Sequence, residues 1–436
     1  AIGTGARANR DNAIAIGVNL RADGTKAIGI GADNTVNGIG AIAIGNNDST
    51  RITNQGVQGN GAIGVGSNLT VRGNNAIAVG TEAQAKANHA IAIGAGTQAV
   101  GEDSIAIGRS EGTKLTQAAT KQSLAIGWTA RAIGATQAVA IGPDAIASGT
   151  QSTSIGNNTR AEGDSSIAIG GDDWNIVRTK QVAAAGNKQV HQVYQELTGV
   201  EMKAQGEAYK NPFKGTTAGD AAVAICVAAL AEGTLSTAFG SGTSASGVGA
   251  AAFGVGATAS QNKSVAIGAG SHTRTDATAV TTATVNGITY GGFVGTTHIT
   301  SGSQVSFGSE GYERQLKHVA PGAITATSTD AINGSQLYAL HAGSGNIAKA
   351  VANALGGGAA VGIDPTNNQG TVTLPSYDVF KGNTTPNAVG SSTTKFNPAA
   401  ATNVGSALTN LNTYVNQGFT VKDNAGAAKG IVTPGE

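Results

Sequence analysis

Alternating isoleucine and alanine, closed by a glycine, is the dominant hydrophobic pattern of this chain. Residues 13–17 read Ala-Ile-Ala-Ile-Gly, and the pattern returns with small changes at 41–45, 76–80, 90–94 and 104–108. An apolar alternation of period two predicts a β-strand, with the isoleucines on one face and the alanines on the other. The glycine predicts a tight corner after each strand.

The corner glycines recur at a fixed step of 14 residues within four blocks. They stand at 3, 17, 31 and 45, at 66, 80, 94 and 108, at 142, 156 and 170, and at 240, 254 and 268. A fixed period predicts one structural unit stacked on itself. The other nine residues hold a turn, a second short strand such as 83–87, and a polar return turn. Each repeat is therefore predicted to be one rung of a parallel β-roll, with rungs about 4.8 Å apart.

The 14-residue step fails at four places, where we expect loops or insertions. Polar residues fill 46–60 and 109–122, and a β excursion with a turn at 285–288 occupies 276–303. The longest interruption is 171–220, where apolar residues at i, i+3, i+4 and i+7 predict a helix, namely Val190, Val193, Tyr194 and Leu197. Gly170 and Cys226 are 56 residues apart, which equals four repeats of 14. An open alternative is therefore that part of this segment forms degenerate rungs. Cys226 itself takes a corner-glycine position.

Beyond the last rung-like strand at 304–308 the composition changes, and helical seams replace the rungs. Ser328, Thr329 and Asp330 are N-cap candidates. Two rows spaced by seven then predict a short coiled coil, Leu337/Ser344/Val351 and Leu340/Ile347/Ala354, which the glycines at 356–358 end. Residues 359–401 return to β-type sequence. A second seam follows, formed by Val404, Leu408, Leu411 and Val415.

Composition narrows the class of protein. Charged residues are 12% of the chain, aromatic residues are 4%, and the formal net charge is +1. A nucleic-acid binder would show a basic stripe, so we expect no nucleic-acid partner. A core of two isoleucines and a few alanines per rung is thin, which predicts a homo-oligomer. The chain begins in mid-rung without Met, so we expect it to be part of a longer protein.

Catalysis is poorly supported, and we expect neither an enzyme nor a cofactor. The six histidines are scattered without the spacing of metal ligands. Asp172-Asp173 resembles half of a carboxylate pair, but we interpret it as a solvated loop. The glycines of 59–64 match GxGxxG, but a strand stands where the helix of a phosphate-binding loop should begin.

Trp174, at the start of the long interruption, has two interpretations. It packs the inserted helix onto the roll, or it is an exposed aromatic anchor for a ligand, since tryptophan is enriched in binding hot spots. We retain Trp174 as the candidate ligand-contact residue. Ser344 likewise either sets the register of the seam or is merely tolerated near a helix end.

These patterns together resemble the passenger of a trimeric autotransporter adhesin. The Ala-Ile-Ala-Ile-Gly rungs are similar to a YadA-like head. The segments 314–322 and 328–338 resemble the neck signature of that family. Residues 356–419 are similar to the Trp-ring module, with Phe419 near the place of its usual tryptophan, and the tail resembles the opening of a GIN-type module.

The resemblance implies a fold dominated by β-structure and a division of the chain. Each chain would form a left-handed parallel β-roll of 14-residue repeats, and three rolls would make a homotrimeric head with the isoleucine strands inward. The neck would pass the head into a short trimeric coiled coil and a small α+β stalk module. The implied domains are the head at 1–311, the neck at 312–341, the coiled coil at 342–358, the Trp-ring-like module at 359–420, and the start of a truncated further module at 421–436.

The implied residue roles fall into three groups. The trimer core would contain Ile14, Ile16, Ile42, Ile44, Ile91, Ile93, Ile105 and Ile107. The neck would use Arg314, Asp330, Asn333, Gly334, Ser335, Gln336 and Leu337. The coiled-coil seams would use Leu340, Ile347, Val351, Val404, Leu408, Leu411 and Val415.

The implied function is adhesion at the surface of a Gram-negative bacterium. The fibre would bind host matrix, cell surfaces or abiotic surfaces, promote cell aggregation, and be held in the outer membrane by a C-terminal anchor absent from this fragment. Two other functions remain open. A glycan-binding or glycan-cleaving phage tailspike would need paired carboxylates, and an ice-binding solenoid would need a rank of threonines; Thr25, Thr53 and Thr81 do not repeat through the other rungs.

Overall fold

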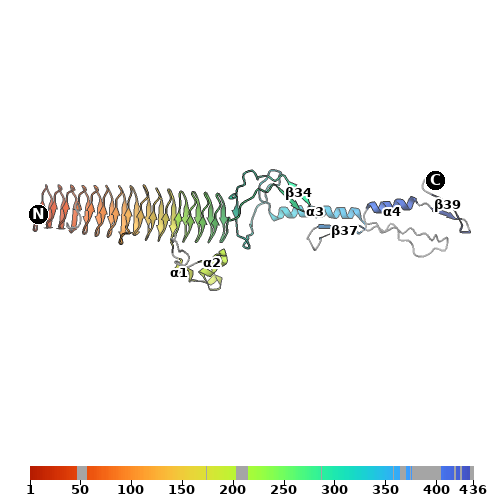
Figure 1. The fold of residues 1–436 in the computed structure, drawn as a ribbon, viewed down its shortest axis with the longest axis horizontal. Coiled ribbons are helices and arrows are strands. Elements are labelled where there is room, and N and C mark those ends of the chain that lie inside the picture. The colour runs from red at the N-terminus through yellow and green to blue at the C-terminus, as the bar shows by residue number, and fades with distance from the viewer. Residues whose placement is uncertain are drawn as a thin grey trace. The chain divides into compact units, whose positions relative to one another are not determined.

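The structure is a computed structural model that describes residues 1–46, 56–172, 174–202, 215–285, 287–356, 358–363, 370–373, 375, 404–416, 419–422 and 425–432. The chain divides into two compact units, 1–315 and 316–436. Unit 1 is a parallel β-solenoid, in which each repeat adds one strand to each of two long sheets (Figure 1). The fold class predicted from the 14-residue period, a β-dominated parallel roll, is confirmed.

The first sheet contains the isoleucine strands, 16 in all, each parallel to the next along the roll. They are β2 Ile14–Val18, β4 Ile28–Ala32, β6 Ile42–Asn46, β8 Ile63–Val65, β10 Ile77–Val79, β12 Ile91–Ile93, β14 Ile105–Arg109, β16 Leu124–Trp128, β18 Val139–Ile141, β20 Thr153–Gly156, β22 Ile167–Gly170, β26 Val223–Ile225, β28 Thr237–Phe239, β30 Ala251–Phe253, β32 Val265–Ile267 and β35 Val305–Ser306. The second sheet has 15 short strands. They are β1 Arg7–Ala8, β3 Arg21–Ala22, β5 Thr35–Val36, β7 Gly56–Val57, β9 Thr70–Val71, β11 Gln84–Ala85, β13 Gln98–Ala99, β15 Gln117–Ala118, β17 Arg131–Ala132, β19 Ile146–Ala147, β21 Arg160–Ala161, β25 Thr217–Ala218, β27 Leu230–Ala231, β29 Ser244–Ala245 and β31 Thr258–Ala259.

Alanine fills most of the space between the two sheets, with leucine and valine in a few rungs near the N-terminus. Ala92 in β12 and Ala99 in β13 are fully buried, as are their counterparts in most other rungs. The register is in step with the repeat, since Ile91 pairs with Ile105 and Ala92 with Ala106. Buried hydroxyls return hydrogen bonds to their own rung; Ser104 Oγ donates to the Gly101 carbonyl at 2.6 Å. The interior is thus narrow, and several of its buried hydroxyls, such as those of Ser104, Ser152 and Ser166, are paired with backbone carbonyls.

The corner glycines are required by both conformation and space. Gly17 has a φ of 141°, and a Cβ placed there would lie 1.6 Å from the carbonyl oxygen of Gly31 in the next rung. Cys226 occupies this column with a φ of 99°. A side chain at that φ is strained, because L-residues rarely adopt it.

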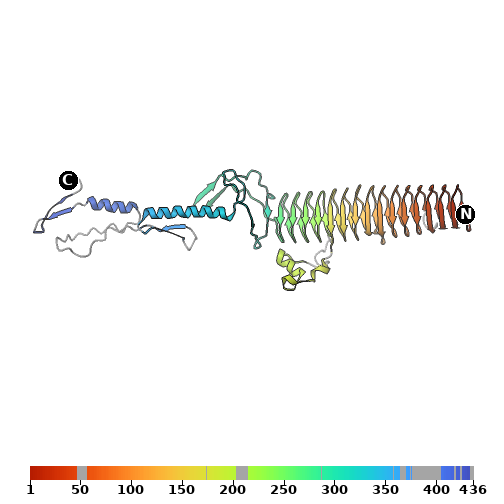
Figure 2. The ribbon, with the colours of Figure 1, turned by 180° about the vertical axis from the view of Figure 1, so that it is seen from behind.

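The long interruption inserts a small subdomain into one corner without adding a rung. Ile167 pairs directly with Val223, so no additional rung lies between β22 and β26. Within 171–220, β25 Thr217–Ala218 belongs to the roll, where it pairs with β21 and β27. The described elements are α1 Asn175–Arg178, β23 Gln181–Val182, the 3-10 helix η1 Ala183–Ala185, β24 Lys188–Gln189 and α2 Val190–Thr198. Both views show it beside the rungs that follow it (Figures 1 and 2). The predicted helix forms, but its buried residues are Tyr194 and Thr198, while Leu197 is 47% exposed.

Helix α2 packs against corners of the roll that carry glycine. A Cβ at Gly256 would lie 2.7 Å from Thr198 Cγ2, and one at Gly242 would lie 2.6 Å from Tyr194 Oη. One at Gly270 would lie 2.6 Å from the Thr198 Cα. Equivalent corners elsewhere bear larger side chains such as Asn158. The glycines therefore make room for the insertion.

Beyond β32 the chain leaves the roll once and returns. Strands β33 Thr282–Val285 and β34 Ile288–Gly291 form an antiparallel hairpin. Strand β35 then pairs with β32, Val305 opposite Val265, and ends the sheet. Unit 2 contains α3 Gly334–Leu355, the hairpin β36 Ala360–Ile363 with β37 Gly370–Thr373, α4 Val404–Asn416, and the hairpin β38 Phe419–Lys422 with β39 Ala428–Val432.

The N-cap of α3 is Asn333, so Ser328, Thr329 and Asp330 do not cap the helix. One continuous helix runs through the predicted end of the neck and the predicted coiled coil. The loop expected at 46–60 and the Trp-ring-like segment at 359–420 lie largely outside the described residues, and so do Asp173 and the side chains of Val415 and Phe419.

Replacing Cys226 with glycine should stabilise the roll. The substitution removes a side chain from a φ of 99°, and relieving such strain is worth about 1 kcal/mol. Thermal unfolding of Cys226→Gly and of Cys226→Ala, which keeps a Cβ, measures it. Equal melting temperatures for the two variants would contradict the strain.

Deleting 173–215 should leave the roll intact, because β22 already pairs with β26 across the insertion. Joining Asp172 to Thr216 restores a corner of the usual length. We expect unchanged β-sheet content by circular dichroism, with loss of the small helical signal. Loss of the cooperative β transition would show that the insertion holds the rungs together.

Candidate subunit interface and surface groove

The isoleucine strands turn their larger side chains outward, away from the alanine interior. Exposed fractions are 46% for Ile14, 37% for Ile16, 40% for Ile44 and 38% for Ile93. The other predicted core residues, Ile42, Ile91, Ile105 and Ile107, are half-buried. The face continues through Ile167, Ile169, Phe239, Phe253 and Ile267, which are 37–50% exposed.

Such a face is unusual for a lone chain. Neighbouring isoleucines stack in register, Ile14 opposite Ile28 and Ile16 opposite Ile30. Contiguous apolar patches beyond a few hundred Å² are rare on monomers and mark interaction surfaces. The isoleucine face, defined as the outward side of the 16-stranded sheet, is therefore a surface built for association.

The helices of unit 2 carry apolar seams that are equally uncovered in the single chain. On α3 the exposed fractions are 63% for Leu337, 68% for Leu340, 68% for Ile347 and 48% for Val351. On α4 they are 41% for Val404, 60% for Leu408 and 43% for Leu411. Ser344 Oγ donates to the Leu340 carbonyl at 3.0 Å, which satisfies this hydroxyl within its own helix.

Two predicted neck residues fasten the start of α3 to the loop before it. Asn333 Oδ1 accepts from the Gln336 N–H at 3.2 Å, and Gln336 Oε1 accepts from the Asn333 N–H at 3.2 Å. This reciprocal pair is a capping box. Gln336 Nε2 also donates to the Gly322 carbonyl at 2.7 Å, and Asn333 Nδ2 donates to the Val319 carbonyl at 3.1 Å. The neck signature is therefore a set of loop-to-helix hydrogen bonds.

The remaining neck residues surround this network. Asp330 Oδ2 accepts from the Ala323 N–H at 3.0 Å, and Ser335 Oγ donates to Asn333 Oδ1 at 2.8 Å. Gly334 is the first residue of α3, and a Cβ there would meet open space.

Arg314 belongs to unit 1 and bonds to the end of the roll. Its Nη1 donates to Ser271 Oγ at 3.0 Å and to the Phe307 carbonyl at 2.6 Å. Its Nη2 donates to the Ala269 carbonyl at 2.5 Å. One guanidinium thus donates hydrogen bonds to two backbone carbonyl groups at the C-terminal end of the roll.

Trp174 is buried rather than displayed. Its side chain is 8% exposed and meets Tyr194 edge to face, with ring centroids 5.6 Å apart. Met202 and Ala228 complete this cluster between α2 and the roll. The candidate role as an exposed ligand anchor is therefore wrong for Trp174, and the packing interpretation holds.

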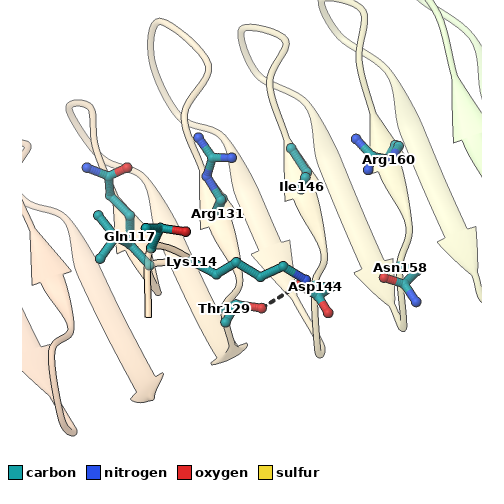
Figure 3. A pocket seen from close by; sticks show the side chains of 10 residues that line it. Lys114, Gln117, Thr129, Arg131, Asp144, Ile146, Asn158 and Arg160 are labelled. Atoms are coloured by element: carbon teal, nitrogen blue, oxygen red, sulfur yellow. Dashed lines mark hydrogen bonds and ion pairs between the residues drawn. The ribbon is translucent and has the colours of Figure 1, made fainter. Parts of the chain in front are cut away.

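A polar groove opens on the outer side of the second sheet (Figure 3). Its volume is about 480 Å³. Outward side chains of four successive short strands line it, from Gln117, Arg131, Ile146 and Arg160, together with Thr113, Lys114, Leu115, Thr129, Asp144 and Asn158. Lys114 Nζ lies 3.3 Å from Asp144 Oδ1, which also accepts from Thr129 Oγ1 at 2.5 Å.

The wall of the groove is the extra loop predicted within 109–122. Glu111 and Lys114 close it as a tight hairpin through two backbone hydrogen bonds of 2.8 and 2.9 Å. Thr116 Oγ1 anchors its base on the Arg109 and Gly127 carbonyls. Sequence reasoning flagged this loop but missed Trp128, which is 38% exposed, with Lys114 Nζ 5.7 Å from its ring centroid. Its place directly after a corner glycine was the available signal.

Catalytic chemistry finds no further support in the described residues. Asp172 is 1% exposed and accepts from Asn157 Nδ2 at 3.1 Å and Asn158 Nδ2 at 2.6 Å, so the expectation of a solvated loop is wrong for this carboxylate. Within the described ranges, no group of three metal-binding side chains gathers. None of the described helices is long and apolar enough to cross a membrane.

Comparison with known proteins agrees with this geometry. The family described as the YadA head domain repeat matches residues 1–19, 22–47, 72–97, 85–110, 121–145, 134–159, 147–172, 231–254 and 245–271. The family described as the coiled stalk of trimeric autotransporter adhesin matches residues 315–360.

Curated relatives carry the same designation. Autotransporter adhesin EhaG of Escherichia coli O157:H7 is 38% identical over 122 residues, which are 28% of this chain and 6% of that protein. Autotransporter adhesin BtaE of Brucella suis biovar 1 (strain 1330) is 40% identical over 84 residues, 19% of this chain and 10% of that protein. Trimeric autotransporter adhesin AtaA of Acinetobacter sp. (strain Tol 5) is 35% identical over 125 residues, 29% of this chain and 3% of that protein.

Head repeats followed by a stalk segment, in that order, place the chain in the YadA-like trimeric autotransporter adhesin family. The chain matches at most a tenth of the length of these curated relatives. Its similarity to AtaA is of the same modest degree as its similarity to the other two, so it is a relative of that protein rather than a close counterpart.

Replacing Ile91 and Ile93 with serine should weaken association between chains. Burying one isoleucine completely is worth about 1.5–3 kcal/mol, and the single chain already covers part of each, so we expect a loss of about 2–4 kcal/mol per chain. Sedimentation and thermal unfolding measure it. The control replaces Gln84 and Gln98 with serine on the second sheet in neighbouring rungs. An unchanged assembly in the isoleucine variant would show that this face is not the interface.

Proposed function

We propose that this chain is the head and upper stalk of a homotrimeric surface fibre. The observation that carries the proposal is the isoleucine face, which is continuous along the roll and includes side chains 38–50% exposed, such as Ile14, Ile93 and Phe239. Three copies that turn this face inward bury it against one another. The seams of α3 and α4 favour the same arrangement, because heptad-spaced leucines and isoleucines need partner helices.

The fibre attaches cells through many weak, non-catalytic contacts. Three identical outer flanks on each fibre and many fibres on each cell supply avidity without a deep pocket. The named relatives are adhesins. The ligands are host matrix, other cells or abiotic surfaces, and the fibre stands outside the outer membrane of a Gram-negative cell on an anchor carried by a longer protein.

The assembly is tested on the purified chain. Sedimentation at micromolar concentration should give a species of three times 42.7 kDa. A folded monomer would contradict the trimer, because the isoleucine face would then remain in water. Release of reducing ends from a polysaccharide would instead favour the tailspike alternative.

The function is tested on cells that display the chain on an outer-membrane anchor. We expect cells with the full chain to attach to matrix-coated and plastic surfaces, and cells with residues 1–315 removed to attach at the level of cells without the protein. Surface labelling of a shared tag controls for display. Equal attachment of the two strains would place adhesion outside the head.

A further inference from the structure

We propose that the groove beside the 110–116 loop binds a linear acidic polysaccharide, one with a carboxylate or sulfate on alternate sugars. The inference rests on the proposed adhesive function and names a ligand class for it. The groove holds three cationic side chains, Lys114, Arg131 and Arg160, and one carboxylate, Asp144. Its lining is therefore more positive than the nearly neutral chain as a whole.

The two arginines are free to take a ligand. Lys114 is paired with Asp144, whereas Arg131 and Arg160 make no side-chain hydrogen bond or ion pair with any described residue. A guanidinium binds a carboxylate or a tetrahedral oxyanion through two parallel N–H groups. Figure 3 shows both arginines on the same side of the sheet, on β17 and β21, with Ile146 on β19 between them.

The register sets their spacing. Arg131 pairs with Ile146, and Ile146 pairs with Arg160, so the arginines are two strands apart. Two strand spacings are about 10 Å, which matches the advance of about two sugars along an extended polysaccharide. Acidic groups on alternate sugars can therefore meet both guanidiniums. Ile146 offers an apolar surface to the sugar between them.

The edge of the groove adds an aromatic ring. Trp128 is partly exposed next to Lys114, and an exposed indole offers a flat apolar surface for the C–H face of a sugar. The hairpin of Glu111 and Lys114 holds this wall in place. The groove is on the second sheet, across the alanine interior from the isoleucine face, so it stays open when that face is covered.

Binding is measured with the full chain on hyaluronan and chondroitin sulfate oligosaccharides, with neutral dextran and single-stranded DNA as comparisons. Hyaluronan carries carboxylates alone and chondroitin sulfate adds sulfate, so the two separate the acidic groups. We expect Arg131→Gln with Arg160→Gln to weaken binding about tenfold or more and to reduce its salt dependence. Trp128→Ala should weaken binding while leaving the salt dependence unchanged.

The matched control is Arg7→Gln with Arg21→Gln. These arginines pair with each other in the same column of the second sheet, so the charge change is equal, but they lie far along the roll from the groove, and Arg21 is bound to Asp23. We expect the control to stay within about twofold of the unchanged chain. Melting temperatures of both pairs verify folding.

Three results would overturn the inference: no binding of either acidic oligosaccharide, equal losses in the two arginine pairs, or DNA bound as tightly as the sugars. The cell-attachment assay is run in parallel on the same variants. Cells that attach while the purified chain ignores acidic sugars would refute the groove and leave the adhesive function standing. Failure of the unchanged chain to support attachment would refute the function itself.

Discussion

The narrowness of the roll interior is the constraint on which the rest of the structure depends. Two sheets meet across a layer made mostly of alanine methyl groups, and Ala92 and Ala99 are fully buried there. A layer this thin encloses little apolar surface per residue. Leucines fit inside where a glycine faces them, as Leu20 does at Gly29 and Leu69 at Gly64. The isoleucines turn outward, where the single chain covers them only in part and another copy of the chain can cover the rest. Space is equally limited at the corners, where a Cβ on Gly17 would lie 1.6 Å from the carbonyl oxygen of Gly31.

Much of this was predictable from the sequence because it follows from period. The 14-residue step and the alternation within it predict strands, faces, corners and the exposed isoleucine rank, and the pairing of Ile91 with Ile105 has that register. The helix of the insertion was also predictable. The residues that this helix buries were not predictable. Thr198 is buried because it packs against the corners at Gly256 and Gly270, and these contacts join segments that are distant in the sequence.

The candidate sites show the same division. Asn333 and Gln336 belong to a recognisable motif, yet the motif alone does not say that Gln336 reaches back to Gly322. The sequence alone left two roles for Trp174, because tryptophan is suited both to packing in a buried cluster and to binding a ligand at the surface. The groove was hidden because Arg131 and Arg160 become neighbours only once the register is known. Trp128 was missed because the periodic pattern describes the corner glycine before it and says nothing about the residue that follows.

The bonds of Arg314 have a consequence for growth of the stack. A roll of parallel rungs ends in a row of backbone groups that any further strand would extend, and such edges invite uncontrolled pairing. At the C-terminal end, the guanidinium occupies the Ala269 and Phe307 carbonyls. A second roll that approached this end would have to displace a charged, hydrogen-bonded group. Arg314 thus covers backbone groups at the C-terminal end of the roll, and this end is not free to pair with the exposed strands of a second copy.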